Sequence, residues 1–355
     1  MEPTFDEAEA RALYEYMMSG GWVTEFVKTR EFETEIANFV GAKHAMAVNN
    51  GTVALCASLL AVGVGPGDEV IVPDLTMIAS ANCATLIGAR PVLVDVEPQN
   101  LCLNTALLKG HLSEKTKAVI HVSFNGRTND LTELKRFCNL HKLFLIEDAA
   151  QSLGSYFRNA HLGTIGDLGT FSFSALKIIT TGQGGIVVTQ SDNLATRLRK
   201  IKDFGRLKGG EDIHDSLGYN FKFTDIQAVL GLEQMKKLES RIRRKKEIYA
   251  LYRSGLQDIE AIEWVPTDLS QTTPWFIDIF VDDPNDLLTY LRQHHIGTRL
   301  IYPPIHTQKA YQVVGNFPVA ERFAQRGLWL PSSIKLTDGD ISYICDAIAG
   351  YFKKK

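Results

Sequence analysis

The chain has 355 residues, of which 45% are hydrophobic and 22% charged, and its formal net charge at pH 7 is -3. A chain of this length can bury a full core, and this composition excludes a disordered or fibrous protein. The small negative charge lacks the basic excess that binding to a nucleic-acid backbone uses, so we expect no nucleic acid among the partners.

The cysteines and the start of the chain indicate the cellular compartment in which we expect the protein. The five cysteines are an odd number and form no CxxC pair, which argues against a disulfide framework and against a zinc site. The acidic start lacks a secretory signal, and no apolar run approaches the roughly 20 residues that span a bilayer. We therefore expect a cytoplasmic protein with no metal site and no membrane segment.

Seven short apolar runs predict the strands of one sheet. They are rich in β-branched residues and are bounded by Gly, Pro and Asp, as strands buried on both faces are. They cover residues 45–48, 69–72, 91–94, 118–122, 143–146, 170–173 and 185–189. Helix candidates between them cover residues 52–62, 80–87 and 131–141. The pattern predicts an α/β fold with a mostly parallel sheet, in which ligands collect at the carboxyl ends of the strands.

A periodic segment over residues 224–256 predicts one long helix that links two domains. Strand-like and helix-like segments alternate beyond it, so we place a large domain at residues 1–240 and a smaller α/β domain at residues 241–355. Thr337 and Asp340 resemble a capping box for the last helix. The basic run from Arg241 to Lys246 is interpreted as a solvated helix face, not as a nucleic-acid patch.

An acid and a lysine, Asp148 and Lys177, carry the strongest chemical signal. Asp148 follows the predicted strand over residues 143–146, with Gln151 in the same turn, and Lys177 follows the strand over residues 170–173. Pyridoxal phosphate needs both groups, because its aldehyde forms a Schiff base with an amine and its pyridine nitrogen stays protonated beside a carboxylate. Each residue alone has an ordinary alternative, a helix N-cap for Asp148 and a solvated charge for Lys177. The apolar neighbours of Lys177 favour a desolvated amine with a lowered pKa.

The segment Asn50-Gly51-Thr52 marks a strand-to-helix junction. Free backbone N–H groups and the helix dipole make such a junction an anion site, which suits a phosphate ester. Helix starts of this kind are common, so the segment is weak evidence alone. Together with Asp148, Gln151, Ser172 and Lys177 it predicts a site for a phosphate-bearing cofactor.

These motifs resemble those of the DegT/DnrJ/EryC1/StrS family of nucleotide-sugar aminotransferases, which are fold-type I pyridoxal-phosphate enzymes. The resemblance spans almost the whole chain. Matching stretches include Asn50-Gly51-Thr52, Ala79-Ser80-Ala81-Asn82, Glu147-Asp148-Ala149-Ala150-Gln151-Ser152, Phe171-Ser172-Phe173, Lys177 to Gly185, Gly218-Tyr219-Asn220-Phe221-Lys222 and Tyr302-Pro303-Pro304-Ile305-His306.

The resemblance implies a fold-type I large domain with a seven-stranded, mostly parallel sheet. It implies that Lys177 forms the Schiff base, that Asp148 faces the pyridine nitrogen and that Gln151 faces the ring hydroxyl. Residues implied to hold the cofactor phosphate are Gly51, Thr52 and Ser172. It also implies a homodimer with shared active sites, in which an asparagine matching Asn220 reaches the phosphate from the neighbouring subunit.

Two segments depart from the family pattern near the expected substrate site. Met77 stands where many relatives place an aromatic ring on the cofactor, and its sulfur can still pack there. The run from Val122 to Arg127 replaces a His-Leu-Tyr-Gly-like segment, so Arg127 is a candidate substrate contact. A proline-stiffened loop that could grip a diphosphate or sugar, or else simply join the domains, supplies three more: Arg299, Tyr302 and His306. Trp275 is a weaker candidate, because a buried aromatic residue is more commonly a packing anchor.

The family implies transfer of an amino group from L-glutamate, with 2-oxoglutarate as product, to a nucleotide-linked keto sugar. We expect amination at C4 of a 4-keto-6-deoxy sugar, as in perosamine or viosamine synthases. The nearest alternative is a C3 aminotransferase acting on a 3-keto sugar. An alternative of another class is a non-catalytic cofactor-binding sensor, which would need a DNA-binding appendage that the short segment before Asn50 does not provide.

Overall fold

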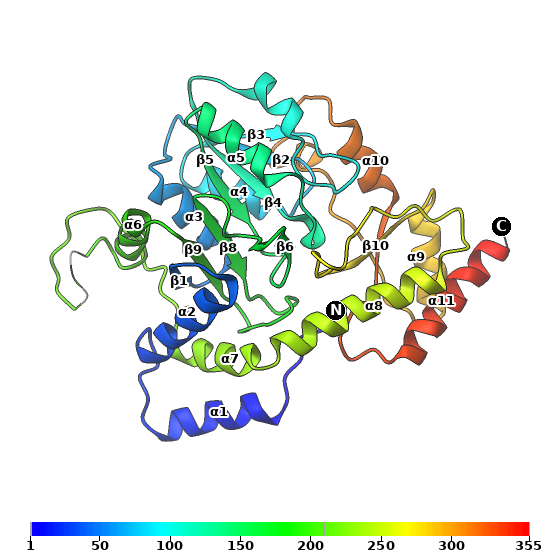
Figure 1. The fold of residues 1–355 in the computed structure, drawn as a ribbon, viewed down its shortest axis with the longest axis horizontal. Helices are drawn as coiled ribbons and strands as arrows, with labels where there is room; N and C mark the ends of the chain where they lie inside the picture. Colours follow the sequence, from blue (N-terminus) through cyan, green and yellow to red (C-terminus); the bar gives the residue numbers. More distant parts are fainter. Residues whose placement is uncertain (1, 207, 209, 355) are drawn as a thin grey trace.

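A seven-stranded sheet lies at the centre of the protein, whose computed structural model describes residues 2–206, 208 and 210–354 (Figure 1). Its strands are β1 (His44–Val48), β2 (Glu69–Pro73), β3 (Arg90–Val94), β4 (Thr116–Val122), β5 (Phe144–Asp148), β8 (Leu168–Ser172) and β9 (Gly185–Thr189). They are ordered β1-β9-β8-β5-β4-β2-β3, and β9 is antiparallel to both of its neighbours while the other pairs are parallel. The seven predicted strands and the mostly parallel sheet are confirmed.

Helices cover both faces of this sheet because successive strand residues point to opposite sides. Ile71 packs in one layer, whereas its neighbours Val70 and Val72 pack in the other. One face is covered by α3 (Gly51–Ala61), α4 (Ala79–Leu86) and α6 (Asp192–Lys202). The other is covered by α2 (Val27–Val40), α5 (Leu131–Leu140) and α7 (Asp225–Met235). The sheet therefore lies between two layers of helices, and its edge strand β3 is only partly buried.

Shorter elements complete the large part of the molecule. The N-terminal helix α1 (Glu7–Met18) packs along α7, as Figure 1 shows. A small hairpin joins β6 (Tyr156–Phe157) to β7 (Ala160–His161). The short 3-10 helices η1 (Thr105–His111) and η2 (Phe124–Gly126) also lie here, whereas η3 (Ile305–Thr307) follows β11 (Arg299–Leu300) later in the chain.

The predicted single helix over residues 224–256 is wrong in one respect, because it is two helices. α7 ends at Met235, and α8 (Leu238–Gly255) begins three residues later. At the break, the amide of Lys237 bonds to the carbonyl of Gln234, three residues earlier, at 3.1 Å. The Lys237 amine at this break lies 2.7 Å from Asp6 Oδ2 and 2.7 Å from Glu9 Oε1.

A second, smaller α/β unit follows α8. Its sheet has the antiparallel order β10-β12-β11, formed by β10 (Ile277–Phe280), β11 (Arg299–Leu300) and β12 (Gly327–Leu330). Its helices are α9 (Pro284–Gln293), α10 (Pro318–Arg326) and α11 (Asp338–Lys353). The capping box of Thr337 and Asp340 is confirmed. A separate apolar core extends from Ile248 to Tyr351, and the exact division at residue 240 stays a prediction.

Within the described residues, no helix has both the length and the apolarity that a membrane crossing requires.

Candidate active site

The carboxyl edge of the main sheet brings Asp148 and Lys177 close to each other. Asp148 is the last residue of β5, and Lys177 lies in the loop after the neighbouring strand, β8. Desolvation lowers the pKa of the Lys177 amine to about 7, and the Asp148 carboxylate partly opposes this shift. An amine that is substantially neutral near pH 7 can act as a nucleophile and as a base.

Ser80 holds the Asp148 carboxylate in place. The Ser80 hydroxyl, on α4, donates to Asp148 Oδ2 at 2.7 Å, and the amide of Ala150 donates to Oδ1 at 3.2 Å. Burial raises the pKa of Asp148, and these hydrogen bonds to its charged form act against that rise. The sequence marks Ser80 only as part of a matching stretch, because its contact with Asp148 depends on how α4 packs.

The start of α3 lies against the end of β8 and forms a small polar cradle. Asn50 caps the helix by accepting the Val53 amide at 2.9 Å, and the first helical bond joins Ala54 to Asn50. The amides of Gly51 and Thr52 precede that bond. A Cβ on Gly51 would lie 3.0 Å from Ser172 Cβ and 3.2 Å from its Oγ, so Gly51 and Ser172 line the same space. Two helix N-terminal amides and a hydroxyl suit a phosphate group.

The side chain of Gln151 is oriented by the segment from Val122 to Arg127, one of the two that depart from the family pattern. Its Oε1 accepts the amide of Asn125 at 2.9 Å, so its amide nitrogen is the group left to donate elsewhere. Asn125 adopts a left-handed conformation with φ 51°, and the next residue, Gly126, has φ 82°. This turn directs the Asn125 backbone towards Gln151 and fixes the orientation of its amide, whose contact with a ring hydroxyl stays a prediction.

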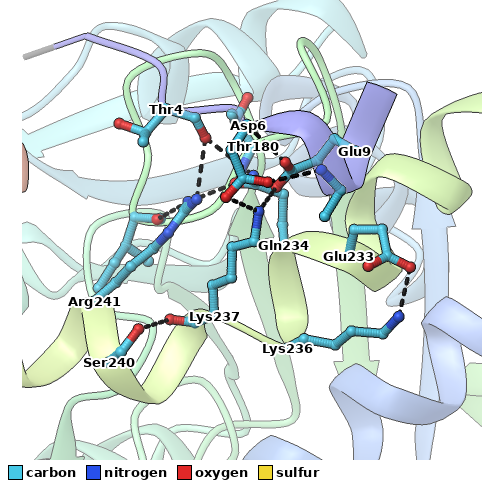
Figure 2. Close-up of polar contacts among 12 residues, drawn as sticks. Thr4, Asp6, Glu9, Thr180, Glu233, Gln234, Lys236, Lys237, Ser240 and Arg241 are labelled. Carbon is cyan, nitrogen blue, oxygen red and sulfur yellow. Dashed lines mark hydrogen bonds and ion pairs between the residues drawn. The ribbon is translucent and has the colours of Figure 1, made fainter. Parts of the chain in front are cut away.

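Two buried side chains of the linking helices hold the loop that follows Lys177 (Figure 2). Arg241 donates to the Ile178 carbonyl at 3.0 Å and to Gln234 Oε1 at 2.5 Å. Gln234 Oε1 also accepts the amide of Thr180 at 3.2 Å. The lysine loop is therefore anchored one and three residues after Lys177.

The same network reaches the N-terminal helix. Gln234 Nε2 donates to Glu9 Oε1 at 2.5 Å and to the Thr4 carbonyl at 3.1 Å (Figure 2). Gln234 is 0% exposed, and Arg241 and Lys245 are only 5% and 1% exposed. The interpretation of the basic run as a solvated face is therefore wrong for Arg241 and Lys245, which point inward one helical turn apart.

Comparison with known proteins gives the family. The model of the DegT/DnrJ/EryC1/StrS aminotransferase family matches residues 3–349. The chain belongs to this family. It is 35% identical to the GDP-perosamine synthase of Vibrio cholerae over 99% of this chain and 98% of that protein. The structure superposes on the aminotransferase TlmJ from Streptoalloteichus hindustanus with a TM-score of 0.93 and 31% identity, covering 99% and 98% of the two chains. The Spr1654 protein of Streptococcus pneumoniae, solved in its PLP-form, gives 0.92 at 27% identity over 99% and 98%.

As a family member, the protein is an aminotransferase that depends on pyridoxal phosphate. The residues present fit this cofactor, since the Gly51–Ser172 cradle accepts an anion and a desolvated amine lies beside a buried carboxyl group. When bound, pyridoxal phosphate supplies an aldehyde that bonds amines and a pyridine ring that withdraws electron density.

Two of the predicted substrate residues of the aminotransferase, Tyr302 and Arg299, lie next to each other in the smaller unit. Tyr302 is buried, and desolvation with the charge of Asp148 raises the pKa of its hydroxyl. Arg299 is exposed, and its guanidinium lies 5.8 Å from the Tyr302 ring and 5.5 Å from the Trp329 ring. Their contact with substrate stays a prediction.

The prediction of a substrate contact for Arg127 is wrong. Its guanidinium is buried and donates to both oxygens of Asp278, at 3.0 Å and 2.5 Å, and also to the Asn100 carbonyl. The pair ties the segment after β4 to β10. A buried guanidinium held in this way has no free face for a substrate.

His306 lies between two carboxylates, and its contact with substrate stays a prediction. Nδ1 lies 2.6 Å from Oδ2 of the fully buried Asp74, and Nε2 lies 3.3 Å from Oε1 of Glu321. Both ring nitrogens therefore face carboxylates. His306 therefore ties its loop to Asp74, the residue directly after β2.

Met77 and Asn220 lie at exposed positions. Met77 is 46% exposed, and its carbonyl accepts the amide of Ser80 at 3.1 Å, at the start of α4. Asn220 is exposed, and its carbonyl accepts from the side chain of Asn49 of the same chain at 3.4 Å. The packing of Met77 on the cofactor and the reach of Asn220 into a neighbouring subunit stay predictions.

Proposed function

We propose that this aminotransferase moves the amino group of L-glutamate to C4 of a nucleotide-linked 4-keto-6-deoxy sugar. The observation that carries the transfer chemistry is the Lys177 amine, with its pKa lowered to about 7, beside the buried Asp148. The choice of substrate is supported by the similarity to GDP-perosamine synthases from Vibrio cholerae and Escherichia coli O157:H7. We also propose a cytoplasmic location, which the five free and buried cysteines support.

Each side chain of the site has a proposed task. Lys177 Nζ bonds the cofactor and, once displaced by the donor, takes a proton from the α-carbon of L-glutamate. Asp148 faces the pyridine nitrogen, with Ser80 holding the carboxylate, and Gln151 donates to the ring hydroxyl. The proposed phosphate ligands are Gly51, Thr52 and Ser172. When the sugar enters, Lys177 returns a proton to its C4.

The proposed sugar-binding wall is formed by Arg299 and Tyr302. Arg299 is an exposed cation beside the site, and a guanidinium suits the diphosphate of a nucleotide sugar. Met77, just before α4, is 46% exposed and is the proposed contact with the cofactor ring. The proposed wall includes no residue that would recognise the base of the nucleotide. Substrates that carry GDP, UDP and dTDP must therefore be compared directly.

We propose a homodimer in which the two active sites share residues. Exposed apolar side chains within residues 22–26 and just before Asn220 support a covered surface, because large apolar patches on a monomer usually mark an interface. They include Trp22 at 62%, Phe26 at 48%, Leu217 at 90% and Tyr219 at 45% exposed. A second copy of the chain would bring Asn220 to the phosphate of its partner.

Absorbance measurements test the chemistry. We expect the purified protein to be yellow because of its bound cofactor. L-glutamate should bleach the visible absorbance band of the cofactor, and a nucleotide-linked 4-keto sugar should restore that band. The Lys177→Ala protein should be colourless and inactive. A wild-type protein with bound cofactor that never responds to L-glutamate would overturn the proposal. Restoration by 3-keto sugars but not by 4-keto sugars would assign amination to C3.

Mixing two inactive variants tests the shared site. Lys177→Ala and Asn220→Ala subunits, mixed and allowed to exchange, form heterodimers. If Asn220 acts across the interface, one site of each heterodimer has both wild-type residues, and we expect activity to return. If Asn220 acts within its own subunit, both sites stay defective and the mixture stays inactive.

A further inference from the structure

Trp275 is in direct contact with the lysine. The Lys177 amine lies 3.5 Å from the centroid of the Trp275 ring, on the face of the indole. Trp275 is 7% exposed and lies just before β10 of the smaller unit. A cation on the face of a tryptophan ring is attracted by the ring quadrupole, most strongly where water is excluded. The indole therefore favours the charged form of an amine that burial alone would neutralise.

The position of the indole is fixed by hydrogen bonds to both parts of the molecule. Its Nε1 donates to the carbonyl of Leu176 at 2.8 Å, directly before Lys177. The Trp275 carbonyl accepts from the amine of Lys245, which is 1% exposed and also donates to the Ser332 carbonyl at 2.9 Å. Trp275 is thus held at its ring and at its backbone.

The segment that carries Trp275 is also tied to the loops of the main sheet. The amide of Thr273 donates to Ser155 Oγ at 2.9 Å, and the Thr273 hydroxyl donates to the Gly154 carbonyl at 2.6 Å. The amide of Phe276 donates to Asn125 Oδ1 at 3.3 Å. The ring face is therefore preorganised against the lysine loop, so its contact with the amine does not depend on a mobile side chain.

We propose that Trp275 is a positioning residue for Lys177, whose indole face holds the amine whenever that amine is not bonded to the cofactor. This inference rests on the proposed role of Lys177. A base that has just been displaced must stay within reach of the donor's α-carbon, and the ring gives it a resting place that is neither solvent nor an ion pair. Asp148, at the end of β5, is the charged group whose field acts on the amine, and Lys245 lies behind the Trp275 backbone.

The test uses the enzyme loaded with pyridoxamine phosphate, because Lys177 is then free. The pH dependence of Lys177 arylation by an amine-reactive reagent is followed by peptide mass spectrometry. In Trp275→Leu the ring face is lost, so the ammonium is less favoured and the midpoint should fall by about one pH unit. Trp275→Phe keeps a smaller ring and should give a smaller fall. The matched control is Trp264→Phe, a tryptophan packed on Tyr249 in the other core, which should not move the midpoint.

A kinetic readout accompanies the labelling. Bleaching by L-glutamate should be about tenfold or more slower in Trp275→Leu than in the wild-type enzyme, with a larger isotope effect for α-deuterated glutamate. An unchanged labelling midpoint and isotope effect in Trp275→Leu would overturn the inference. If Trp275→Leu does not fold, the test rests on Trp275→Phe. A labelling midpoint in Trp275→Phe equal to that of the wild type would then contradict the proposal. A Lys177→Ala enzyme that still transaminates would instead overturn the proposed function.

Discussion

The hydroxyl of Ser80 lies 2.7 Å from Asp148 Oδ2, and this bond joins α4 to the end of β5 at the point where the cofactor ring is proposed to lie. It is a charge-assisted bond in a buried place, so it favours the carboxylate over the carboxylic acid. In the proposed mechanism Asp148 acts on the pyridine nitrogen only when it is charged, so we expect Ser80 to influence the chemistry through Asp148.

Replacing Ser80 by alanine should shift the pH dependence of the reaction. Without the hydroxyl the pKa of Asp148 rises further, so the acid limb of the L-glutamate half-reaction should move to higher pH by about one unit. Rapid-mixing absorbance across a pH series measures this shift. Thr76→Ala is the control, since Thr76 Oγ1 lies 3.4 Å from Ser80 Oγ and has no hydrogen bond to Asp148. An unmoved acid limb in Ser80→Ala would remove Ser80 from the mechanism.

A methyl group at Gly51 should weaken cofactor binding. The added Cβ would come within 3.0 Å of Ser172 Cβ and enter the cradle proposed for the phosphate. We expect Gly51→Ala to raise the dissociation constant of pyridoxal phosphate about tenfold or more, which equals about 1.4 kcal/mol. Fluorescence titration of apo-protein measures it. Gly65→Ala is the control, because a Cβ there meets nothing within 4 Å. Equal affinities in the two variants would contradict the phosphate site.

Removing the Gln234 amide should loosen the lysine loop. In Gln234→Leu, the Thr180 amide, Glu9 and Arg241 each lose a partner in a buried place, and we expect a loss of about 2 kcal/mol or more in unfolding free energy. Denaturant unfolding with the cofactor band as a second probe measures it. Lys236→Ala, which removes a lysine 68% exposed beside Glu233, should change stability by less than about 1 kcal/mol. Similar losses of unfolding free energy in the two variants would argue that Gln234 does not hold the lysine loop.

Arg127 should matter for stability and little for substrate affinity. Arg127→Met leaves Asp278 buried and unpaired, which costs about 3–5 kcal/mol, whereas Arg127→Met with Asp278→Leu should recover much of the loss. The KM for the nucleotide sugar in the folded double variant should stay near that of the wild type. A double variant that is as stable as the wild type but has lost sugar affinity would restore Arg127 to the substrate site.

The sequence determined the architecture and the reacting groups by itself. Short apolar runs specify strands through local periodicity, so the seven strands of the sheet could be predicted within a few residues. Asp148 and Lys177 follow two of these strands, and parallel strands that lie side by side bring such residues to the same edge. These two groups already pointed to pyridoxal phosphate, and the match of these segments to a known family added the reaction.

Only the tertiary structure decided which polar side chains are free to act. Arg127 meets Asp278 across 151 residues, and His306 meets Asp74 across 232, so neither pairing leaves a local signal. Burial of Arg241 depends on how the first turn of α8 packs against the lysine loop. Trp275 reaches Lys177 from another unit of the fold. The charge, burial and direction of a side chain depend on partners distant in sequence, and periodicity carries no information about them.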